Sequence, residues 1–536
     1  MIEPELVCIN GNVITVDDVD SVQEAFAVKD GRFLSVGKNR DVIKLRGPGT
    51  EVIDLRKRTV LPGFIDAHAH LLSLTGKTYL QVDCSGPDVR SIDDIVRKLS
   101  RKASRTEPGK WILGVGYDDS KLSEGRHPTR RDLDRVSREH PVHIRHVSGH
   151  LGVVNSLGFR LAGIDEDTSP PEGGGFDRDA DGNLNGVLRE EADFLFLSGI
   201  ARGKAIIPPF TEEEELTGLM EGCREFNRYG ITSTGDALVN RAELSTFIKA
   251  EELGLLTVRV YMMVFDSLLP SLAAAGLRTG FGNDMVRIGP VKTFIDGAIA
   301  GRTAWLSRPY ENRPDDYGIQ TKTFEELEVI VGSAHEAGFQ VAVHANGDRA
   351  IETTLDVYEK VLEARPRPDH RHRIEHCTVV TPRILERIKN LGVVVLPFST
   401  YVYQHGDKMG EYGSRIGMMF PHGSFLEYGI PVGGSSDNPC ATEDVFLAIR
   451  TMVTRLSASG EVLGPEQRIS VRDALRIYTR GSAYASFDEK RKGSISEGML
   501  ADFIIPSDDP FAVEAERIDS IVVDKTYVGG KLVYER

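Results

Sequence analysis

Strand-like apolar segments alternate with amphipathic, helix-like segments through the middle of the chain. The helix-like segments, such as 323–337 and 349–364, repeat their apolar residues at the spacing of a helical turn. The expected strands end at or near residues 66, 236, 264, 294, 344, 376, 397 and 437. Eight strands joined by helical crossovers predict an α/β fold, a (β/α)8 TIM barrel, which we expect over residues 59–489.

Both ends of the chain have a sequence pattern typical of β structure. Asn10-Gly11 and Asp30-Gly31 each separate two short apolar runs, and Gly529-Gly530 does the same near the C-terminus. Such pairs are typical of tight hairpin turns. Neither end is long enough for a sandwich alone, so we predict that residues 1–58 and 490–536 pair into one small β-sandwich domain. Two independent hairpin modules are the alternative.

The interval after the first barrel strand is too long for one crossover. It contains a strand-like run at 111–116 and a Gly/Asp-rich stretch at 173–182. That stretch resembles a calcium loop but lacks the Glu expected at its twelfth position, so a hairpin is favoured. We predict a large insertion after strand 1, an inserted subdomain over the barrel mouth formed by residues 72–215.

Charge and hydropathy exclude several classes of partner. The chain has 536 residues with 65 Lys+Arg against 80 Asp+Glu, a net charge of −15. This charge repels nucleic acid and anionic lipid, so neither is expected as a partner. The longest apolar stretches, such as 392–398, fall far below the roughly 20 residues that span a bilayer. The first residues lack the basic and apolar regions of a signal peptide, so the expected location is cytoplasmic.

A His-x-His pair ends the first barrel strand. His68 and His70 close the apolar run that begins at Val60. In an extended strand, residues i and i+2 point to the same side, so both imidazoles can reach one metal ion. The five cysteines are scattered and form no Cys-x-x-Cys pair, which leaves nitrogen and oxygen ligands for the metal.

Three further polar residues stand where other barrel strands stop. His344 and His376 each close an expected strand, and Asp437 closes the last one. Functional groups of such barrels sit at the C-terminal ends of the strands. Singly, each has an ordinary explanation as a rim histidine or a helix-capping carboxylate. Together with the His-x-His pair, they suit one or two borderline metal ions, zinc or another divalent metal.

Lys292 lies near the end of the fourth expected strand, where a buried ammonium is costly unless it is paired or neutralised. Addition of CO2 would convert this lysine into an N6-carboxylated, anionic ligand that bridges two metals. An ordinary ion pair of Lys292 with Asp296 or Asp437 is the alternative.

These residues lie in segments that resemble the amidohydrolase superfamily, family 3 type, over essentially the whole chain. The likeness is closest to the branch that includes N-substituted formamide deformylase. The segments that carry it are Leu61-Pro-Gly-Phe-Ile-Asp-Ala-His-Ala-His70, Val291-Lys-Thr-Phe-Ile-Asp-Gly297, Val343-His-Ala-Asn-Gly-Asp348, Arg373-Ile-Glu-His376, Gly434-Ser-Ser-Asp437 and Gly498-Met-Leu-Ala-Asp502.

The resemblance implies a role for each position. His68 and His70 would bind the more buried metal, His344 and His376 the second, and Lys292 would bridge them as a carbamate. Asp437 would be both a metal ligand and the catalytic base. Family members carry one metal or two, so the number of ions stays open.

The resemblance also suggests residues that contact substrate. Tyr117, Asp118 and His150 occupy family positions in the insertion that overhang the pocket, and Arg302 and Trp305 follow the fourth strand. Polar residues with a purely structural role are the alternative for the first three.

The predicted activity is hydrolysis of a non-peptide C–N (amide) bond in a small molecule. Metal-activated hydroxide would attack the carbonyl while Asp437 acts as general base and then general acid. A hydrolytic deaminase of a heteroaromatic ring is one alternative, and a non-catalytic barrel scaffold is another. The sequence leaves the oligomeric state open, with a homo-oligomer among the possibilities.

Overall fold

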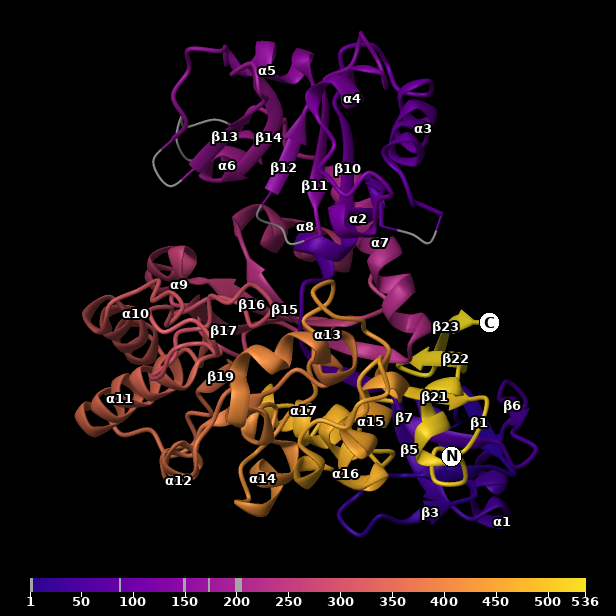
Figure 1. The fold of residues 1–536 in the computed structure, drawn as a ribbon. Coiled ribbons are helices and arrows are strands. Elements are labelled where there is room, and N and C mark those ends of the chain that lie inside the picture. Colours follow the sequence, from indigo (N-terminus) through magenta and orange to yellow (C-terminus); the bar gives the residue numbers. More distant parts are fainter. Residues whose placement is uncertain (1–2, 86–87, 148–150, 172–173, 198–204) are drawn as a thin grey trace. The chain divides into compact units, whose positions relative to one another are not determined.

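The computed structural model describes residues 3–85, 88–147, 151–171, 174–197 and 205–536. The chain divides into two compact units (Figure 1). One unit contains Met1–Thr75 with Met220–Arg536, and the other contains Gly76–Leu219. Each unit has its own sheets.

A parallel, nearly closed barrel sheet forms the centre of the larger unit. Its strand order is β8-β15-β16-β17-β18-β19-β20, and every neighbouring pair is parallel. The strands are β8 (Phe64–Ala69), β15 (Ile231–Val239), β16 (Arg259–Phe265), β17 (Val286–Phe294), β18 (Val341–Ala345), β19 (Arg373–His376) and β20 (Val394–Leu396). Nearly all of their residues are buried, as expected for a sheet covered on both faces.

The segment 431–437 lies between the two edges of this sheet. It makes parallel bridges to Val395 of β20 and to Phe398 just after that strand, and Gly434 O accepts a hydrogen bond from Ala67 N of β8 at 2.8 Å. A Cβ at Gly434 would stand 2.7 Å from the Tyr478 ring, so only glycine fits there. The expected last strand is therefore an irregular segment that joins both edges through isolated bonds.

Helices follow the strands along the chain, as the alternating pattern predicts. Those of the larger unit include α8 (Arg241–Glu252), α9 (Leu269–Ala274), α10 (Phe324–Glu336), α11 (Asp348–Ala364), α12 (Pro382–Leu391), α13 (Tyr401–Met409), α14 (His422–Glu427), α15 (Val445–Thr454), α16 (Val471–Arg476) and α17 (Ser482–Ala485). Helix α7 (Glu212–Arg228) connects the two units in sequence. Side-chain caps start several helices; the Thr323 hydroxyl, for example, accepts from Glu326 N at α10. Among the described residues, every helix is too short or too polar to cross a bilayer.

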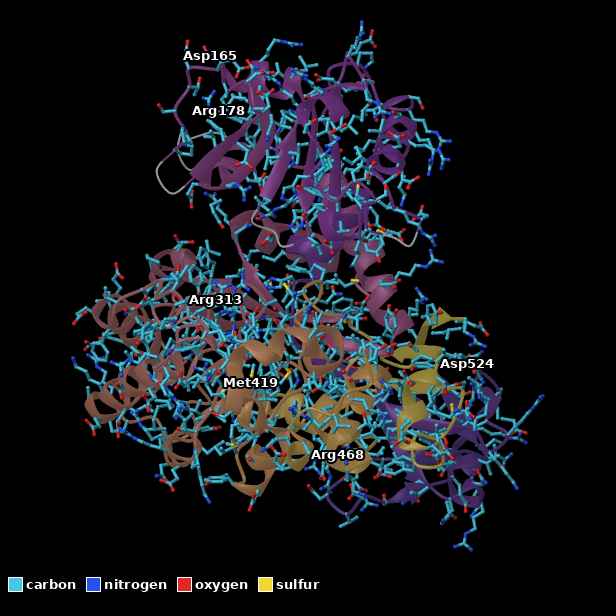
Figure 2. All side chains as sticks on the ribbon, viewed as in Figure 1. Asp165, Arg178, Arg313, Met419, Arg468 and Asp524 are labelled. Carbon is cyan, nitrogen blue, oxygen red and sulfur yellow. The ribbon has the colours of Figure 1, made fainter. Side chains whose placement is uncertain are left out.

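Two small sheets are built from the chain ends: one contains N-terminal strands alone, and the other combines strands from both ends. One has the order β5-β4-β1-β6 and the other β23-β22-β21-β7-β2-β3. Their strands are β1 (Leu6–Ile9), β2 (Asn12–Ile14), β3 (Val22–Gln23), β4 (Ala25–Lys29), β5 (Arg32–Gly37), β6 (Glu51–Asp54), β7 (Thr59–Pro62), β21 (Phe503–Pro506), β22 (Val523–Val528) and β23 (Lys531–Glu535). Phe26 and Phe503 pack edge to face, with ring centroids 4.9 Å apart, within one cluster shared by both sheets. Arg58 also pairs with Asp524 of β22; Asp524 is labelled in Figure 2.

Two of the three expected hairpins are found. Strands β4 and β5 pair around Asp30-Gly31, and β22 and β23 pair around Gly529-Gly530. The hairpin expected around Asn10-Gly11 is wrong, because β1 pairs with β4 and β6 whereas β2 pairs with β3 and β7. The backbone at this turn bonds elsewhere: Gly11 N donates to Glu24 O at 2.8 Å. The apolar residues on both sides of the turn join the same cluster from different sheets.

The smaller unit is built on its own six-stranded sheet of order β13-β14-β12-β11-β10-β9. The strands are β9 (Val82–Asp83), β10 (Ile112–Tyr117), β11 (Val142–His146), β12 (Leu151–Val154), β13 (Gly174–Arg178) and β14 (Leu184–Glu190). The helices include α2 (Lys77–Tyr79), α3 (Ile92–Ala103), α4 (Arg130–Asp134), α5 (Ser156–Ala162) and α6 (Glu191–Leu197). Strands β13 and β14 pair antiparallel, so the Gly/Asp-rich stretch is a hairpin as expected.

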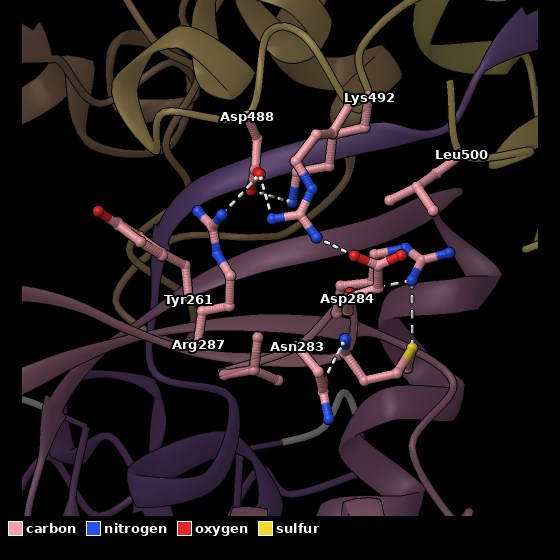
Figure 3. Close-up of a pocket in the computed structure, with 11 residues that line it drawn as sticks. Tyr261, Asn283, Asp284, Arg287, Asp488, Lys492 and Leu500 are labelled. Atoms are coloured by element: carbon pink, nitrogen blue, oxygen red, sulfur yellow. Dashed lines mark hydrogen bonds and ion pairs between the residues drawn. The ribbon is translucent and has the colours of Figure 1, made fainter. Parts of the chain in front are cut away.

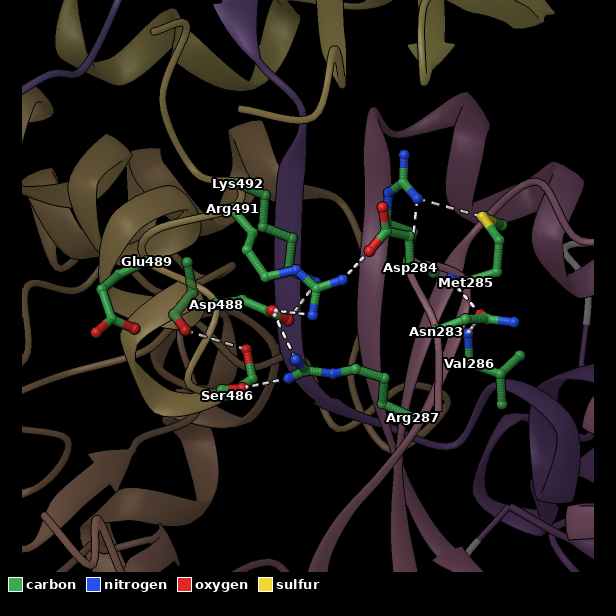
Figure 4. Close-up of polar contacts among 12 residues, drawn as sticks. Asn283, Asp284, Met285, Val286, Arg287, Ser486, Asp488, Glu489, Arg491 and Lys492 are labelled. Atoms are coloured by element: carbon green, nitrogen blue, oxygen red, sulfur yellow. Dashed lines mark hydrogen bonds and ion pairs between the residues drawn. The ribbon is translucent and has the colours of Figure 1, made fainter. Parts of the chain in front are cut away.

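A polar network lies at the N-terminal ends of β16 and β17 (Figure 3). The Asp488 carboxylate meets Arg287 at 3.1 Å, Arg491 at 3.3 Å and Lys492 at 3.2 Å (Figure 4). Ion pairs at this end of a barrel contribute to stability, since the chemistry takes place at the other end of the strands. The network attaches the C-terminal segment to the barrel.

Candidate metal centre

Strand β8 carries the His-x-His pair. The strand runs through His68 to Ala69, and His70 follows it directly, so the expectation that strand 1 ends at residue 66 is wrong by three residues. Both imidazoles are buried, and their ring centroids lie 5.6 Å apart. The strand extends this far because its backbone forms hydrogen bonds with the segment 431–437: Asp437 N donates to His68 O at 2.9 Å.

The two imidazoles are oriented by their Nδ1 atoms. His68 Nδ1 contacts the Glu375 carboxylate, and His70 Nδ1–H donates to Ala237 O at 3.2 Å. Their Nε2 atoms lie 3.1 Å and 3.2 Å from the same atom, Asp437 Oδ1. Partners on the far nitrogen fix the tautomer and direction of metal-binding histidines in the same way.

His376, the last residue of β19, lies beside this group. Its ring centroid is 5.0 Å from that of His68, and the ring stacks on Phe398 at 4.1 Å. His68, His376 and Asp437 each offer a ligand atom within 4.8 Å of the other two. His376 Nδ1 is buried without a hydrogen-bond partner among the described residues. A buried nitrogen without a hydrogen-bond partner is suited to bind a metal ion.

His344 lies on β18, next to His376 but outside that group of three. The two ring centroids are 4.5 Å apart. His344 Nε2–H donates to Gly297 O at 3.1 Å, which leaves the lone pair on Nδ1. Burial, with Lys292 as a second cause, lowers the pKa of His344 to about 3. The imidazole is therefore neutral, the form that binds metal.

Lys292 lies on β17, two residues before the strand ends, and is 3% exposed. Burial lowers its pKa to about 8, against the opposing effect of Glu375 and Asp437. Among the described residues, no carboxylate oxygen lies within ion-pair distance of its ammonium. Asp296, one of the two expected partners, instead accepts hydrogen bonds from the backbone N–H groups of Trp305, Asn346 and Gly347 at 2.8–3.2 Å.

Sequence reasoning did not identify the groups that support these six residues. Arg373 and Glu375 are fully buried on β19 and form an ion pair at 2.8 Å. Burial would raise the pKa of Glu375, but Arg373 and His68 together hold it well below its usual range. Opposite charges at positions i and i+2 of an expected barrel strand were the signal that a buried pair lies there.

Strain and buried carboxylates also mark this end of the barrel. His376 and Asp437 adopt left-handed backbone conformations with φ of 72° and 57°. Non-glycine residues hold such angles at a cost, and they cluster at functional sites. Asp66 accepts from the backbone N–H groups of His68 and Ser436 at 3.2 Å, and burial raises its pKa to about 6. Asp66 thus connects β8 to the segment that carries Asp437.

The five residues predicted to contact substrate lie in different parts of the chain. Tyr117 and Asp118 belong to the inserted unit, and His150 lies outside the described residues. Arg302 pairs with Glu411 at 2.8 Å. Trp305 is half-buried and held through its backbone by Asp296. Their contact with a substrate stays a prediction.

The donor set fits a divalent metal. Burial lowers the pKa of His376 and His344, and the pKa of Asp437 is well below its usual range because the histidines outweigh the effect of burial. Neutral imidazoles and an ionised carboxylate are the forms that coordinate a borderline ion. These metal-binding side chains, at the C-terminal ends of a parallel barrel sheet, place the protein in the class of metal-dependent hydrolases.

Comparison with known proteins assigns the chain within that class. The model of the amidohydrolase family matches residues 51–534. The chain is 30% identical to YtcJ of Bacillus subtilis (strain 168), over 98% of each protein. It is also 30% identical to N-substituted formamide deformylase of Arthrobacter pascens, over 99% of this chain and 98% of the deformylase.

A solved structure shares the fold. An uncharacterized metal-dependent hydrolase from Pyrococcus horikoshii OT3 superposes with a TM-score of 0.79 and 28% identity, covering 95% of this chain and 99% of the other. The chain therefore belongs to the amidohydrolase family and is a metal-dependent hydrolase acting on carbon–nitrogen bonds.

Proposed function

We propose that the protein hydrolyses a non-peptide amide bond in a small molecule, with an N-substituted formamide as the substrate class. The observation that carries the proposal is the meeting of His68 Nε2 and His70 Nε2 at one oxygen of Asp437. These groups come from β8 and from the segment that closes the sheet, and they lie beside His376. The substrate class rests on the similarity to a formamide deformylase along the whole chain.

Six residues would hold the metal: His68, His70, Lys292, His344, His376 and Asp437. One or two divalent ions, zinc in the first place, would polarise the amide carbonyl and acidify the attacking water. Asp437 is ionised and can therefore accept the proton of that water as its oxygen attacks the carbonyl carbon. When the C–N bond breaks, Asp437 returns the proton to the leaving nitrogen, so that the carboxylic acid and the amine are released.

Lys292 completes the proposed site as a carbamate. Its amine is buried, and no carboxylate neutralises it among the described residues. The ammonium first loses one proton to give the free amine; reaction of the amine with CO2 then forms an N–C bond and releases a second proton, so that an anion replaces a buried cation. The anion would face a site that is otherwise made of neutral imidazoles and one carboxylate.

The domain organisation belongs to the same proposal. The two terminal sheets share one hydrophobic cluster, which supports a single small β sandwich of residues 1–58 and 490–536 beside the barrel of residues 59–489. The insertion, residues 72–215, would cover the barrel mouth and supply Tyr117, Asp118 and His150 to the substrate, while Arg302 and Trp305 would line the pocket from the barrel.

The test uses zinc-loaded protein with N-substituted formamides and the matching acetamides, measuring release of formate, acetate and amine. We expect faster hydrolysis of the formamides. Asp437→Asn keeps the size of the side chain but removes the base, so kcat should fall at least about a hundredfold while metal is retained. Near-normal turnover with full metal content would remove Asp437 from this role. Ammonia release from aminated heterocycles instead of amide cleavage would favour a deaminase.

A further inference from the structure

The inserted unit contains a second group of metal-binding side chains. Asp119 begins a short 3-10 helix (Asp119–Lys121), His127 lies in the loop before α4, and His146 is the last residue of β11. One ligand atom of each lies within 4.8 Å of the other two. These three residues, the Asp119 cluster, are separate in sequence from the six proposed ligands of the barrel.

The distances in the Asp119 cluster suit a small ion. Asp119 Oδ1 lies 3.0 Å from His146 Nε2 and 3.6 Å from His127 Nδ1. Ligand atoms of a tetrahedral zinc ion are about 3.3 Å apart, given bonds of about 2.0–2.1 Å. The two measured separations lie on either side of this value, and the ligand atoms of all three residues lie within 4.8 Å of one another.

The chemistry of the Asp119 cluster favours a borderline transition metal. Two imidazoles with one carboxylate suit Zn²⁺, Co²⁺ or Ni²⁺, whereas Mg²⁺ and Ca²⁺ prefer oxygen ligands. The side chains of His146, His127 and Asp119 are 12%, 24% and 34% exposed, so an ion can enter from solvent and keep water ligands.

Tyr117 forms one wall of the cluster. Its hydroxyl lies 3.3 Å from His127 Nδ1, and its ring centroid is 5.1 Å from that of His146. An ion bound here would therefore connect the loop before α4 to the ends of β10 and β11. It would fix the segment that carries Tyr117 and Asp118.

We propose that Asp119, His127 and His146 bind one divalent transition-metal ion, Zn²⁺ or a similar borderline metal, at a site distinct from the barrel centre. The bound ion holds the segment 119–128 against the end of β11. The inference is independent of the reaction proposed for the barrel, because it concerns metal content and local order and makes no use of turnover.

The main test counts metal in the full-length protein. Protein stripped by a chelator is titrated with Zn²⁺ and with Co²⁺, and the bound ions per chain are measured. The double variant His127→Gln/His146→Gln should bind one ion fewer than the wild type. His140→Gln is the matched control, since both His140 ring nitrogens bond outside the cluster, to Ser137 Oγ and Thr106 O, at 2.8 Å and 3.2 Å. It should bind as many ions as the wild type.

Two further measurements keep the test decisive if the double variant misfolds. Asp119→Asn retains the shape of the side chain but removes its charge, and it should weaken one class of Zn²⁺ site at least roughly tenfold. Hydrogen exchange in segment 119–128 should slow on addition of Zn²⁺ in the wild type and not in this variant. Equal metal counts and affinities in the wild type and variants would overturn the proposal and leave Asp119 and His146 as a hydrogen-bonded pair.

Discussion

Replacement of Glu375 by glutamine tests whether the buried ion pair under the metal centre supports both stability and metal binding. Glu375 accepts two bonds from Arg373, at 2.8 Å and 2.9 Å, and contacts His68 Nδ1. Glutamine keeps the size of the side chain and removes the charge. The Arg373 guanidinium would then be a fully buried cation whose remaining bonds include one to Ala67 O at 2.9 Å.

The size of the effect follows from burial. Removing one partner of a buried ion pair costs about 3–5 kcal/mol, because the other charge stays desolvated. Loss of the group that orients a metal-binding histidine weakens metal affinity about 10–100-fold. We therefore expect Glu375→Gln to lower the free energy of unfolding of the larger unit by several kcal/mol and to weaken Zn²⁺ binding by at least one order of magnitude.

The assay combines urea unfolding with competition for Zn²⁺ by a chromophoric chelator. Glu328→Gln is the control, because Glu328 pairs with Lys360 at 2.8 Å on the surface and the same substitution there should cost at most about 1 kcal/mol. A Glu375→Gln protein as stable as this control, with unchanged Zn²⁺ affinity, would refute the reasoning.

Three other predictions follow from the charges of the larger unit. Growth or dialysis with ¹³C-bicarbonate should give a carbamate resonance in the wild type that Lys292→Arg lacks, and Lys292→Ala should regain part of its lost activity with added acetate. Asp488→Asn should destabilise the protein by about 3–5 kcal/mol without changing kcat, since Arg287 and Lys492 lose their counter-charge at the end of the strands away from the metal centre. His372 accepts from Val341 N at 3.0 Å and contacts His335 at 2.8 Å, and burial holds its pKa well below 6.5. Because the pKa of His372 is depressed in the folded protein, the stability that this residue contributes is complete above about pH 6.5. It declines at lower pH, where His372 of the unfolded chain binds a proton. A urea midpoint that stays constant from pH 7 to pH 5 would contradict this.

The parts of the fold that depend on periodicity were predictable. Seven buried strands follow one another in the predicted order, and the C-terminal parts of β8 and β19, with the segment that ends at Asp437, bring His68, His376 and Asp437 together. This succeeded because parallel strands of a barrel end at one rim, so that strand order matters little for finding the site. The β22–β23 hairpin was predictable for a local reason, the Gly529-Gly530 turn.

Features that depend on distant pairing were not predictable. Asn10-Gly11 favours a hairpin locally, but β1 and β2 each find better partners in different sheets. The Glu375 contact with His68 joins β19 to β8, which lie five strands apart in the order of the barrel sheet, and no local pattern reports it. The Asp119 cluster was missed for the same reason, because its residues converge only when β10 and β11 pair.

The pairing of β7 with β21 has a consequence for how the protein is made. Strand β7 leads through Gly63 directly into β8, the strand with the His-x-His pair, and Leu61 of β7 pairs with Ile504 of β21. A ribosome that has released residues 1–490 has therefore produced a barrel whose preceding strand, β7, still lacks its neighbour β21. Nascent chains should become competent to capture metal only late in synthesis, and C-terminal truncations that remove β21 should yield protein that aggregates through the open edge of β7.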